Sequence, residues 1–158
     1  MTKRKAIFPG SFDPFTAGHE SVVERALPLF DNIIIAVGDN ISKTTMLSLS
    51  KRIELIKIVF KGDPKVEVVS YTGLTVDFAK MHNCKFILRG LRTSADFEFE
   101  RAIGQTNKLL NEEIETVFIL ARPEHTFISS SIIRDVYKNN GDLTHLLPNR
   151  ITKADLEI

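Results

Sequence analysis

Phe8-Pro9-Gly10-Ser11-Phe12-Asp13-Pro14-Phe15-Thr16-Ala17-Gly18-His19 is the stretch that decides the fold of this chain. It follows the apolar run 6–8 and precedes apolar residues at helical spacing in 22–27, so it predicts a strand, a loop and a helix in succession. Gly10 and Gly18 let the backbone approach a ligand closely. Ser11, Thr16 and His19 add hydrogen-bonding groups near the amide-rich start of the helix, which suits an anion and above all a nucleotide phosphate.

The rest of the chain alternates short apolar runs with amphipathic segments. The expected strands span 5–8, 32–37, 66–69, 85–88 and 116–120, and the expected helices span 20–30, 50–60, 75–82 and 94–110. Because each expected helix connects two strands, right-handed crossovers give an α/β fold with a doubly wound five-stranded parallel sheet. A chain of 158 residues has the usual length of a single domain, 1–158, and its tail from Gly141 predicts short helices, with 145–147 as a packing patch.

Chemically active side chains follow the ends of the expected strands. In chain order they are Ser11 to His19, Lys43, Thr72 to Thr75, Arg89 to Arg92, and Ser129-Ser130-Ser131. The carboxyl ends of parallel strands meet at one edge of a sheet, so these side chains are expected to line one cleft. Their cationic groups and hydroxyls fit phosphoryl or nucleotidyl transfer. The sequence contains neither a Gly-x-Ser-x-Gly elbow nor the Gly-x-x-x-x-Gly-Lys-Ser/Thr loop of ATPases.

The composition limits which binding partners and which cellular compartment we expect for this protein. A net charge of only +1 gives no reason to expect a nucleic acid or a membrane as partner. Cys84 is the only cysteine, which excludes an internal disulfide and fits a reducing cytosol, and we interpret it as a buried or half-buried structural residue. The first residues contain no long apolar run and no small-residue cleavage site, so we expect a cytoplasmic protein.

The ending Thr16-Ala17-Gly18-His19 resembles the signature of the nucleotidyltransferase superfamily, which is a His or Thr, any residue, and then Gly-His. Within that superfamily, Pro9-Gly10-Ser11-Phe12-Asp13-Pro14 looks like the first motif of the phosphopantetheine adenylyltransferase family. Four further blocks agree in the family's order: Ser42-Lys43, Gly73 to Ala79, Arg89-Gly90-Leu91-Arg92 with Asp96 to Glu100, and Phe127 to Ser131. The resemblance covers nearly the whole chain and implies a Rossmann-like nucleotidyltransferase fold.

The resemblance implies that the phosphate of 4′-phosphopantetheine attacks the α-phosphorus of ATP, giving 3′-dephospho-coenzyme A and pyrophosphate. It assigns His19, Lys43 and Arg92 to the stabilisation of the transition state. Ser11, Lys43, Thr75 and Arg89 match the positions that hold phosphopantetheine. The positions that hold ATP are matched by Ser11, Phe12, His19, Gly90, Leu91, Arg92, Glu100, His125, Thr126, Phe127, Ile128, Ser129, Ser130 and Ser131.

The resemblance also implies a metal and two kinds of partner. Mg²⁺ is expected to bridge the ATP phosphates and to keep most of its waters, so no protein residue is expected as a metal ligand. A homohexamer and feedback inhibition by coenzyme A are expected by analogy with the family. The chain departs from the common family pattern where Ser11 replaces Thr, Thr44-Thr45 follows Lys43, Phe99 replaces Tyr, and His125 stands where Trp is common.

Other interpretations of the same residues stay open. Arg89 and Arg92 would also suit a surface network with Asp96, Glu98 or Glu100. The triple serine is in the first place a signal for a helix N-cap, and the alternating Phe97 and Phe99 are expected in the core. A nucleotidyltransferase acting on nicotinamide mononucleotide, or on glycerol phosphate with CTP, would share 16–19 and the serines. A non-catalytic sensor of coenzyme A or ATP is the alternative from another class of protein.

Overall fold

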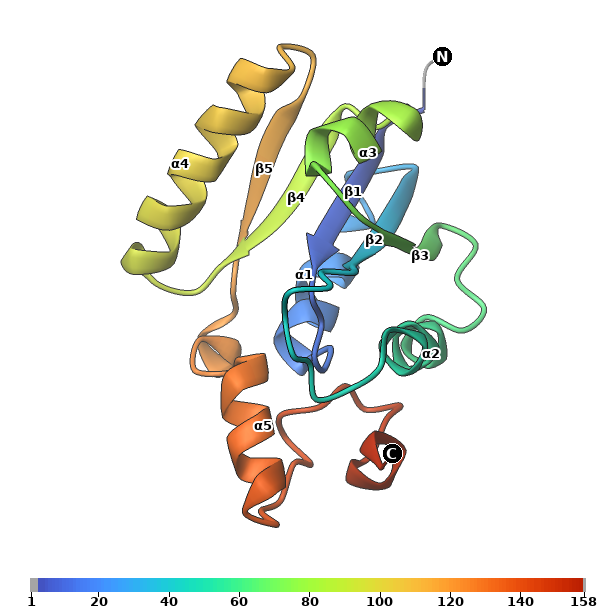
Figure 1. The fold of residues 1–158 in the computed structure, drawn as a ribbon, viewed down its shortest axis with the longest axis vertical. Helices are drawn as coiled ribbons and strands as arrows, with labels where there is room; N and C mark the ends of the chain where they lie inside the picture. Colours follow the sequence, from blue (N-terminus) through green and yellow to red (C-terminus); the bar gives the residue numbers. More distant parts are fainter. Residues whose placement is uncertain (1–2, 158) are drawn as a thin grey trace.

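The structure is a computed structural model that describes residues 3–157. Five parallel strands form its one sheet, in the order β3-β2-β1-β4-β5 (Figure 1). The strands are β1 (Lys5–Gly10), β2 (Asn32–Gly38), β3 (Val66–Tyr71), β4 (Phe86–Leu91) and β5 (Glu115–Leu120). The helices are α1 (Ala17–Ala26), α2 (Leu49–Val59), α3 (Thr75–Met81), α4 (Ser94–Leu110) and α5 (Ser130–Lys138), with 3₁₀ turns at Pro123–His125 and Lys153–Leu156.

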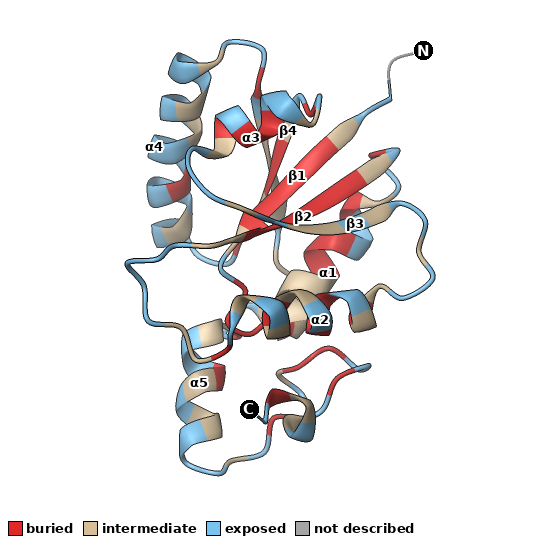
Figure 2. Ribbon diagram, turned by 45° about the vertical axis from the view of Figure 1, so that its right-hand side comes forward, coloured by how far each residue is buried: buried red, intermediate tan, exposed pale blue. Residues whose placement is uncertain are grey.

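Side chains that alternate along the central strands fill a core on each face of the sheet. In β1, Ala6 and Phe8 belong to the core that includes Val23 of α1 and Ile56 of α2, whereas Ile7 belongs to the core on the α3 side. Burial of both faces explains why β1 and β2 are continuous apolar runs rather than alternating ones (Figure 2). The doubly wound parallel sheet expected from the sequence is therefore confirmed.

The chain order changes direction between β1 and β4, which pair as neighbours although α1, β2, α2, β3 and α3 intervene in the sequence. Ligands of doubly wound sheets bind beyond the carboxyl ends of the strands at such a switch point. The loop that follows β1 and the loop that follows β4 both leave the sheet at this edge. The fold thus brings the first motif of the chain next to Arg89 and Arg92.

Side-chain caps set where most of the helices begin. Thr16, Ser48, Thr93 and Ser129 each accept a hydrogen bond from a backbone amide in the first turn of the helix that follows. Such a cap satisfies one of the amides that have no partner inside the helix. The cap at Thr16 makes α1 begin at Ala17, three residues before the start expected from hydrophobic spacing.

Helix α4 corrects one expectation. Phe97 and Phe99 are not core residues in this chain, because 41% and 68% of their surfaces are exposed. Only Glu100 is buried in α4, and Phe97 reaches the sheet with one edge, where its ring lies 6.1 Å from that of Phe118. The helix covers the β4 and β5 edge of the sheet and leaves most of its circumference free (Figures 1 and 2).

Of the remaining expectations about packing, the buried place of Cys84 is confirmed, and the patch expected at 145–147 is confirmed except at His145, which is exposed. Cys84 is buried in the core on the α3 side, and burial raises the pKa of its thiol to about 11. In the tail, Leu143 and Leu147 join the core beneath α1, and the amide of Ala17 donates a hydrogen bond to the carbonyl of Leu146. Within residues 3–157 no helix is long and apolar enough to cross a membrane.

Candidate active site

At the carboxyl edge of the sheet, Gly10 and Arg89 both line two neighbouring cavities. The large cavity, about 700 Å³, extends over the ends of β2 and β3 and along the inner side of α4. The small cavity, about 330 Å³, lies between the start of α1, the loop after β4 and the start of α5. Both are lined by Pro9, Gly10, Ser11, Arg89 and Glu100. The two cavities therefore meet at the switch point, and ligands in them would come into contact there.

The loop after β1 has a shape that its own residues dictate. Phe12 adopts a positive φ of 49° and turns its ring back over Gly10, where a Cβ would lie only 2.8 Å from that ring. Any side chain at position 10 would collide with the ring of Phe12. The same ring packs at 5.0 Å from the ring of His19 and 5.2 Å from that of Phe15. Phe12 thus gives the loop a compact apolar centre, and Ser11 is left exposed at the junction of the cavities.

His19 lines the small cavity at the first turn of α1. The amide of Thr16 donates to its Nδ1 at 3.0 Å, and the amide of His19 donates to the Thr16 hydroxyl at 3.1 Å. Because Nδ1 accepts this hydrogen bond, the proton of the neutral ring lies on Nε2. Burial, followed by the positive charges of Arg89 and Arg92, lowers the pKa of His19 from 6.5 to about 3. At neutral pH His19 is therefore an uncharged donor.

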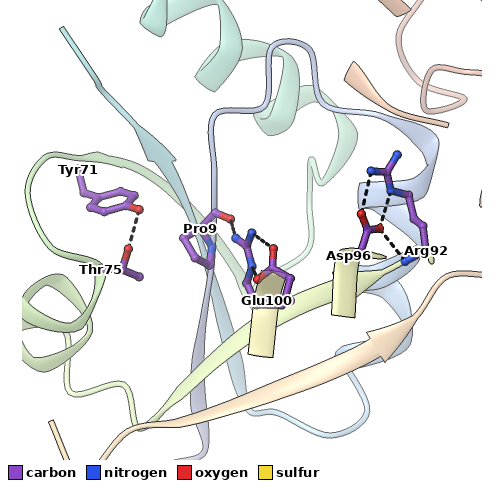
Figure 3. A network of polar contacts seen from close by, with 7 residues as sticks. Pro9, Tyr71, Thr75, Arg92, Asp96 and Glu100 are labelled. Atoms are coloured by element: carbon purple, nitrogen blue, oxygen red, sulfur yellow. Dashed lines mark hydrogen bonds and ion pairs between the residues drawn. The ribbon is translucent and has the colours of Figure 1, made fainter. Parts of the chain in front are cut away.

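Arg89, at the junction of the two cavities, has a carboxylate partner. Its Nε and Nη2 donate to the two carboxylate oxygens of Glu100 at 2.8 and 2.5 Å, and its Nη1 donates to the carbonyl of Pro9 at 2.7 Å (Figure 3). Glu100 is only 8% exposed and is the one buried residue of α4. This bidentate pair fixes the plane of the guanidinium against both α4 and β1.

Arg92 follows β4 and is bound in a similar way. Its backbone amide and Nε donate to Asp96 at 3.0 and 3.1 Å (Figure 3). Its Nη1 donates to the carbonyl of Ile128 at 3.1 Å. It thereby links the start of α4 to the segment that leads into α5. The network of arginines and carboxylates that the sequence left open as an alternative is present, and it lies in the cavity walls.

Lys43 and Thr75 belong to the large cavity. Lys43 is exposed in the loop after β2, and Thr75 begins α3, where its hydroxyl lies 3.0 Å from that of Tyr71 (Figure 3). The side chain of Lys43 makes no hydrogen bond or ion pair within the part of the chain that the structure describes. It is a cation at the mouth of the cavity, available to a ligand.

The triple serine caps α5, as its sequence indicates. The Ser129 hydroxyl accepts from the amide of Ile132 at 3.2 Å, and the Ser130 hydroxyl donates to the carbonyl of Pro14 at 2.8 Å. Ser131 accepts a hydrogen bond from Arg134, whose Nη1 donates to the carbonyl of Asp13. The start of α5 is thus tied to the loop after β1, and Ser129 and Ser130 line the small cavity.

Most residues expected at the nucleotide lie around the small cavity. Its walls include Ser11, Phe12, His19, Gly90, Leu91, Arg92, Glu100, His125, Ile128, Ser129 and Ser130. Thr126, Phe127 and Ser131 do not line it and are exposed. The buried Nδ1 of His125 has no hydrogen-bond partner within residues 3–157, which leaves a polar atom of this wall unsatisfied.

Two residues of the site escaped the sequence analysis. Asp13 is buried and accepts hydrogen bonds from the amides of Met46 and Leu47 at 2.7 and 2.8 Å, which ties the loop after β1 to the loop after β2. Arg52 of α2 is buried beneath the same loops. Asp13 could have been singled out, because it stands inside the first motif. Arg52 carries no such signal, since the pair Lys51-Arg52 resembles any solvated turn of a helix.

The carboxylates of the site do not form a metal cage. The structure of residues 3–157 contains no cluster of three or more His, Cys, Asp or Glu residues that could hold an ion. Asp13 binds backbone amides, and Glu100 and Asp96 bind arginines.

Comparison with known proteins gives the family. Residues 7–136 match the family described as Cytidylyltransferase-like. The chain is 54% identical to a phosphopantetheine adenylyltransferase of Flavobacterium johnsoniae, over 94% of this chain and 97% of that protein. The chain belongs to the phosphopantetheine adenylyltransferase family. A second member, from Nautilia profundicola, is 51% identical over 94% of this chain and 97% of its own length. A third, from Bacteroides thetaiotaomicron, is 48% identical over 92% and 95%.

A solved structure shows the same fold in a more distant protein. This Vibrio parahaemolyticus protein, described as a candidate nicotinate-nucleotide adenylyltransferase, superimposes with a TM-score of 0.71. The alignment covers 98% of this chain and 91% of that one at 21% sequence identity. The Rossmann-like nucleotidyltransferase fold is therefore confirmed for this member of the phosphopantetheine adenylyltransferase family.

Proposed function

We propose that the two cavities bind the two substrates of adenylyl transfer, ATP in the small cavity and 4′-phosphopantetheine in the large one. The enzyme transfers the adenylyl group of ATP to 4′-phosphopantetheine, which gives 3′-dephospho-coenzyme A and pyrophosphate, and its relatives carry the name phosphopantetheine adenylyltransferase. The observation that carries the arrangement is the shared wall at Ser11 and Arg89. Two ligands that fill the cavities meet at this wall, where a group can pass from one to the other.

The reaction needs alignment and charge stabilisation rather than a base. An oxygen of the phosphopantetheine phosphate, already an anion, forms a bond to the α-phosphorus of ATP, and the bond from that phosphorus to the β-phosphate oxygen breaks to release pyrophosphate. Negative charge grows on the α-phosphate oxygens during this step. The neutral His19 can donate its Nε2 hydrogen to one of them. Lys43 and Arg92 supply positive charge from the two sides of the junction.

The two sets of binding residues divide between the cavities. Ser11, Lys43, Thr75 and Arg89 are proposed to hold phosphopantetheine and are supported by their place in the wall of the large cavity. ATP is proposed to contact the residues of the small cavity named above, with the amides at the start of α5 facing its phosphates. Thr126, Phe127 and Ser131 remain part of this proposal as flanking residues.

Mg²⁺ is the metal that we propose for the reaction. When bound to the ATP phosphates it would neutralise part of the charge on the leaving pyrophosphate. On the protein, the positively charged side chains of Lys43 and Arg92 would also help to neutralise the charge on the phosphates. The engagement of Asp13, Asp96 and Glu100 with other protein groups supports a metal held by phosphates and water.

The assembly and its regulation complete the proposal. We propose a homohexamer, supported by apolar side chains such as Phe99, Leu109 and Leu120, which are mostly exposed on α4 and β5. Coenzyme A, which contains the product, is proposed to inhibit by occupying the same two cavities. Residues 1–158 are proposed to be one domain, and the cytoplasmic location rests on the sequence alone.

Product formation from competing substrates tests the function. Purified enzyme with ATP and 4′-phosphopantetheine should release pyrophosphate and form dephospho-coenzyme A, measured by chromatography. Nicotinamide mononucleotide with ATP, and glycerol phosphate with CTP, should give at most traces. Binding of ATP and coenzyme A without any turnover would instead support a sensor.

A further inference from the structure

Arg52 is a buried cation behind the large cavity. It is only 3% exposed and lies in the first turn of α2, at helical spacing from the buried apolar residues Leu55, Ile56 and Val59. Its Nη1 donates to the carbonyl of Ser11 at 2.7 Å and to the carbonyl of Gly38 at 3.0 Å. One guanidinium nitrogen therefore joins the loop after β1 to the end of β2.

The charge of Arg52 has no acidic partner. A buried arginine is ordinarily paired with a carboxylate, because an isolated charge is costly to remove from water. Within residues 3–157, however, Arg52 forms no ion pair, and its buried Nε has no hydrogen-bond partner. Its two partners are neutral carbonyls. The positive charge thus stays uncompensated next to a cavity proposed to receive a phosphate.

Arg52 acts on the two segments that present Ser11 and Lys43. Ser11 and Gly38 both line the large cavity, and Gly38 directly precedes the loop that carries Lys43. At the far end of that loop, Asp13 binds the amides of Met46 and Leu47. The loop is therefore fixed at both ends, by Arg52 at Gly38 and by Asp13 at Met46 and Leu47. Of these two residues, only Arg52 also adds positive charge.

We propose that Arg52 is a positioning residue for adenylyl transfer, which sets the Ser11 and Lys43 loops against each other and adds a buried positive charge toward the phosphate of the acceptor substrate. This inference rests on the proposed function. Arg52 itself is not expected to touch the reacting atoms, because it lines neither of the two cavities and its Nη1 binds the backbone carbonyls of Ser11 and Gly38. Its loss should change turnover and phosphopantetheine binding rather than ATP binding.

Two substitutions of Arg52 separate the contribution of its planar hydrogen-bond donor from that of its positive charge. Arg52→Lys keeps a cation but cannot reproduce the planar donor, and Arg52→Met keeps an apolar stem without charge or donor. Arg150→Met is the matched control, because Nη1 of Arg150 also bridges two carbonyls, those of Val59 and Lys61, at the other end of α2 and outside both cavities. Each protein is assayed for kcat, for both KM values and for melting temperature, with ATP affinity from calorimetry.

Displacement of a positioned group by about 1 Å can cost about 10²-fold in rate. We expect Arg52→Met to lower kcat by about 10²-fold and to raise the KM for phosphopantetheine, with unchanged ATP affinity. Arg52→Lys should lose about 10-fold in kcat with a smaller rise in that KM, since it retains the charge. Arg150→Met should lower only the melting temperature.

The role of Arg52 is overturned if the variants that fold keep kcat and the phosphopantetheine KM within threefold of the parent while melting earlier. Arg52→Lys alone decides the matter if Arg52→Met does not fold. Failure of the parent enzyme to form dephospho-coenzyme A would overturn the proposed function instead, so the two results are distinguishable.

Discussion

The backbone amide of Thr16 holds Nδ1 of His19 while the Thr16 hydroxyl accepts the amide of His19, so the histidine completes the N-cap of its own helix. In this reciprocal arrangement the third helical residue is commonly Glu or Gln. With His there, the cap also orients an imidazole whose free Nε2 carries a hydrogen. The helix start and the proposed transition-state donor are thus one unit.

His19→Ala should lower kcat by about 10² to 10³-fold, about 3 to 4 kcal/mol, because it removes a donor that acts mainly on the transition state. The affinity for ATP should change much less. Steady-state kinetics and ATP calorimetry check both expectations, with His145→Ala, in the tail and outside both cavities, as the control. A kcat within a few fold of the parent would show that His19 has another task.

The lowered pKa of His19 makes the stability of the fold depend on pH. The unfolded chain binds a proton at His19 below about pH 6.5, whereas the folded chain does so only near pH 3, so stability should fall as the pH drops between these values. His19→Gln should flatten this decline, since Gln can serve the cap without titrating. Melting temperatures from pH 7.5 to 4.5 measure it, and equal slopes for parent and variant would contradict the assignment.

Arg89→Ala should affect both the fold and the substrate. It leaves the buried carboxylate of Glu100 without its partner, which should lower the free energy of unfolding by about 2 kcal/mol, and it should raise the KM for phosphopantetheine. The double variant Arg89→Ala with Glu100→Gln should regain stability without regaining that KM. Recovery of the KM together with stability would mean that Arg89 serves the fold alone.

The sequence predicts the arrangement of strands and helices because its apolar runs and helix-capping residues agree with the packing in the structure. Runs such as Ile33–Val37 are apolar throughout, which is typical of a strand buried on both faces, and Thr16, Ser48 and Ser129 stand where helices begin. Convergence at the sheet edge followed from the topology alone. The sequence leaves the pairing of Arg89 and Arg92 with acidic residues open as an alternative to a place in the site, whereas in the structure the paired arginines line the cavities.

Ser129→Ala tests the double task of the serine segment. Loss of the cap should lower the free energy of unfolding by about 1 kcal/mol, and it should weaken ATP binding because the first-turn amides of α5 lose their fixed direction. Ser48→Ala is the control, since Ser48 caps α2 in the same way and lines neither cavity. Calorimetric titration with ATP should show weaker binding for Ser129→Ala than for Ser48→Ala. Equal ATP affinities of the two variants would mean that Ser129 only caps its helix.

Other features depend on tertiary neighbours that no local pattern reveals. Arg52 and Lys51 look alike in the sequence, yet the first lies beneath two loops from elsewhere in the chain. Phe97 and Phe99 have the hydrophobicity of core residues, but Glu100 is the one residue that α4 buries, and both phenylalanines stay exposed. The hydrophobicity of a side chain indicates that its burial would be favourable, but it does not indicate which surface of the fold would cover it.

Hydrogen bonds fix the loop after β2 at several points along its length. Asp13 holds Met46 and Leu47, Arg52 holds Gly38, and the amide of Lys43 closes a turn onto the carbonyl of Asn40. These hydrogen bonds restrict the loop before a ligand binds, so less conformational entropy is left to lose when Lys43 binds a phosphate. Affinity gained in this way needs no additional contact with the ligand. Lengthening the segment between Asn40 and Thr45 would be expected to weaken substrate binding although every side chain in the cavities stayed the same.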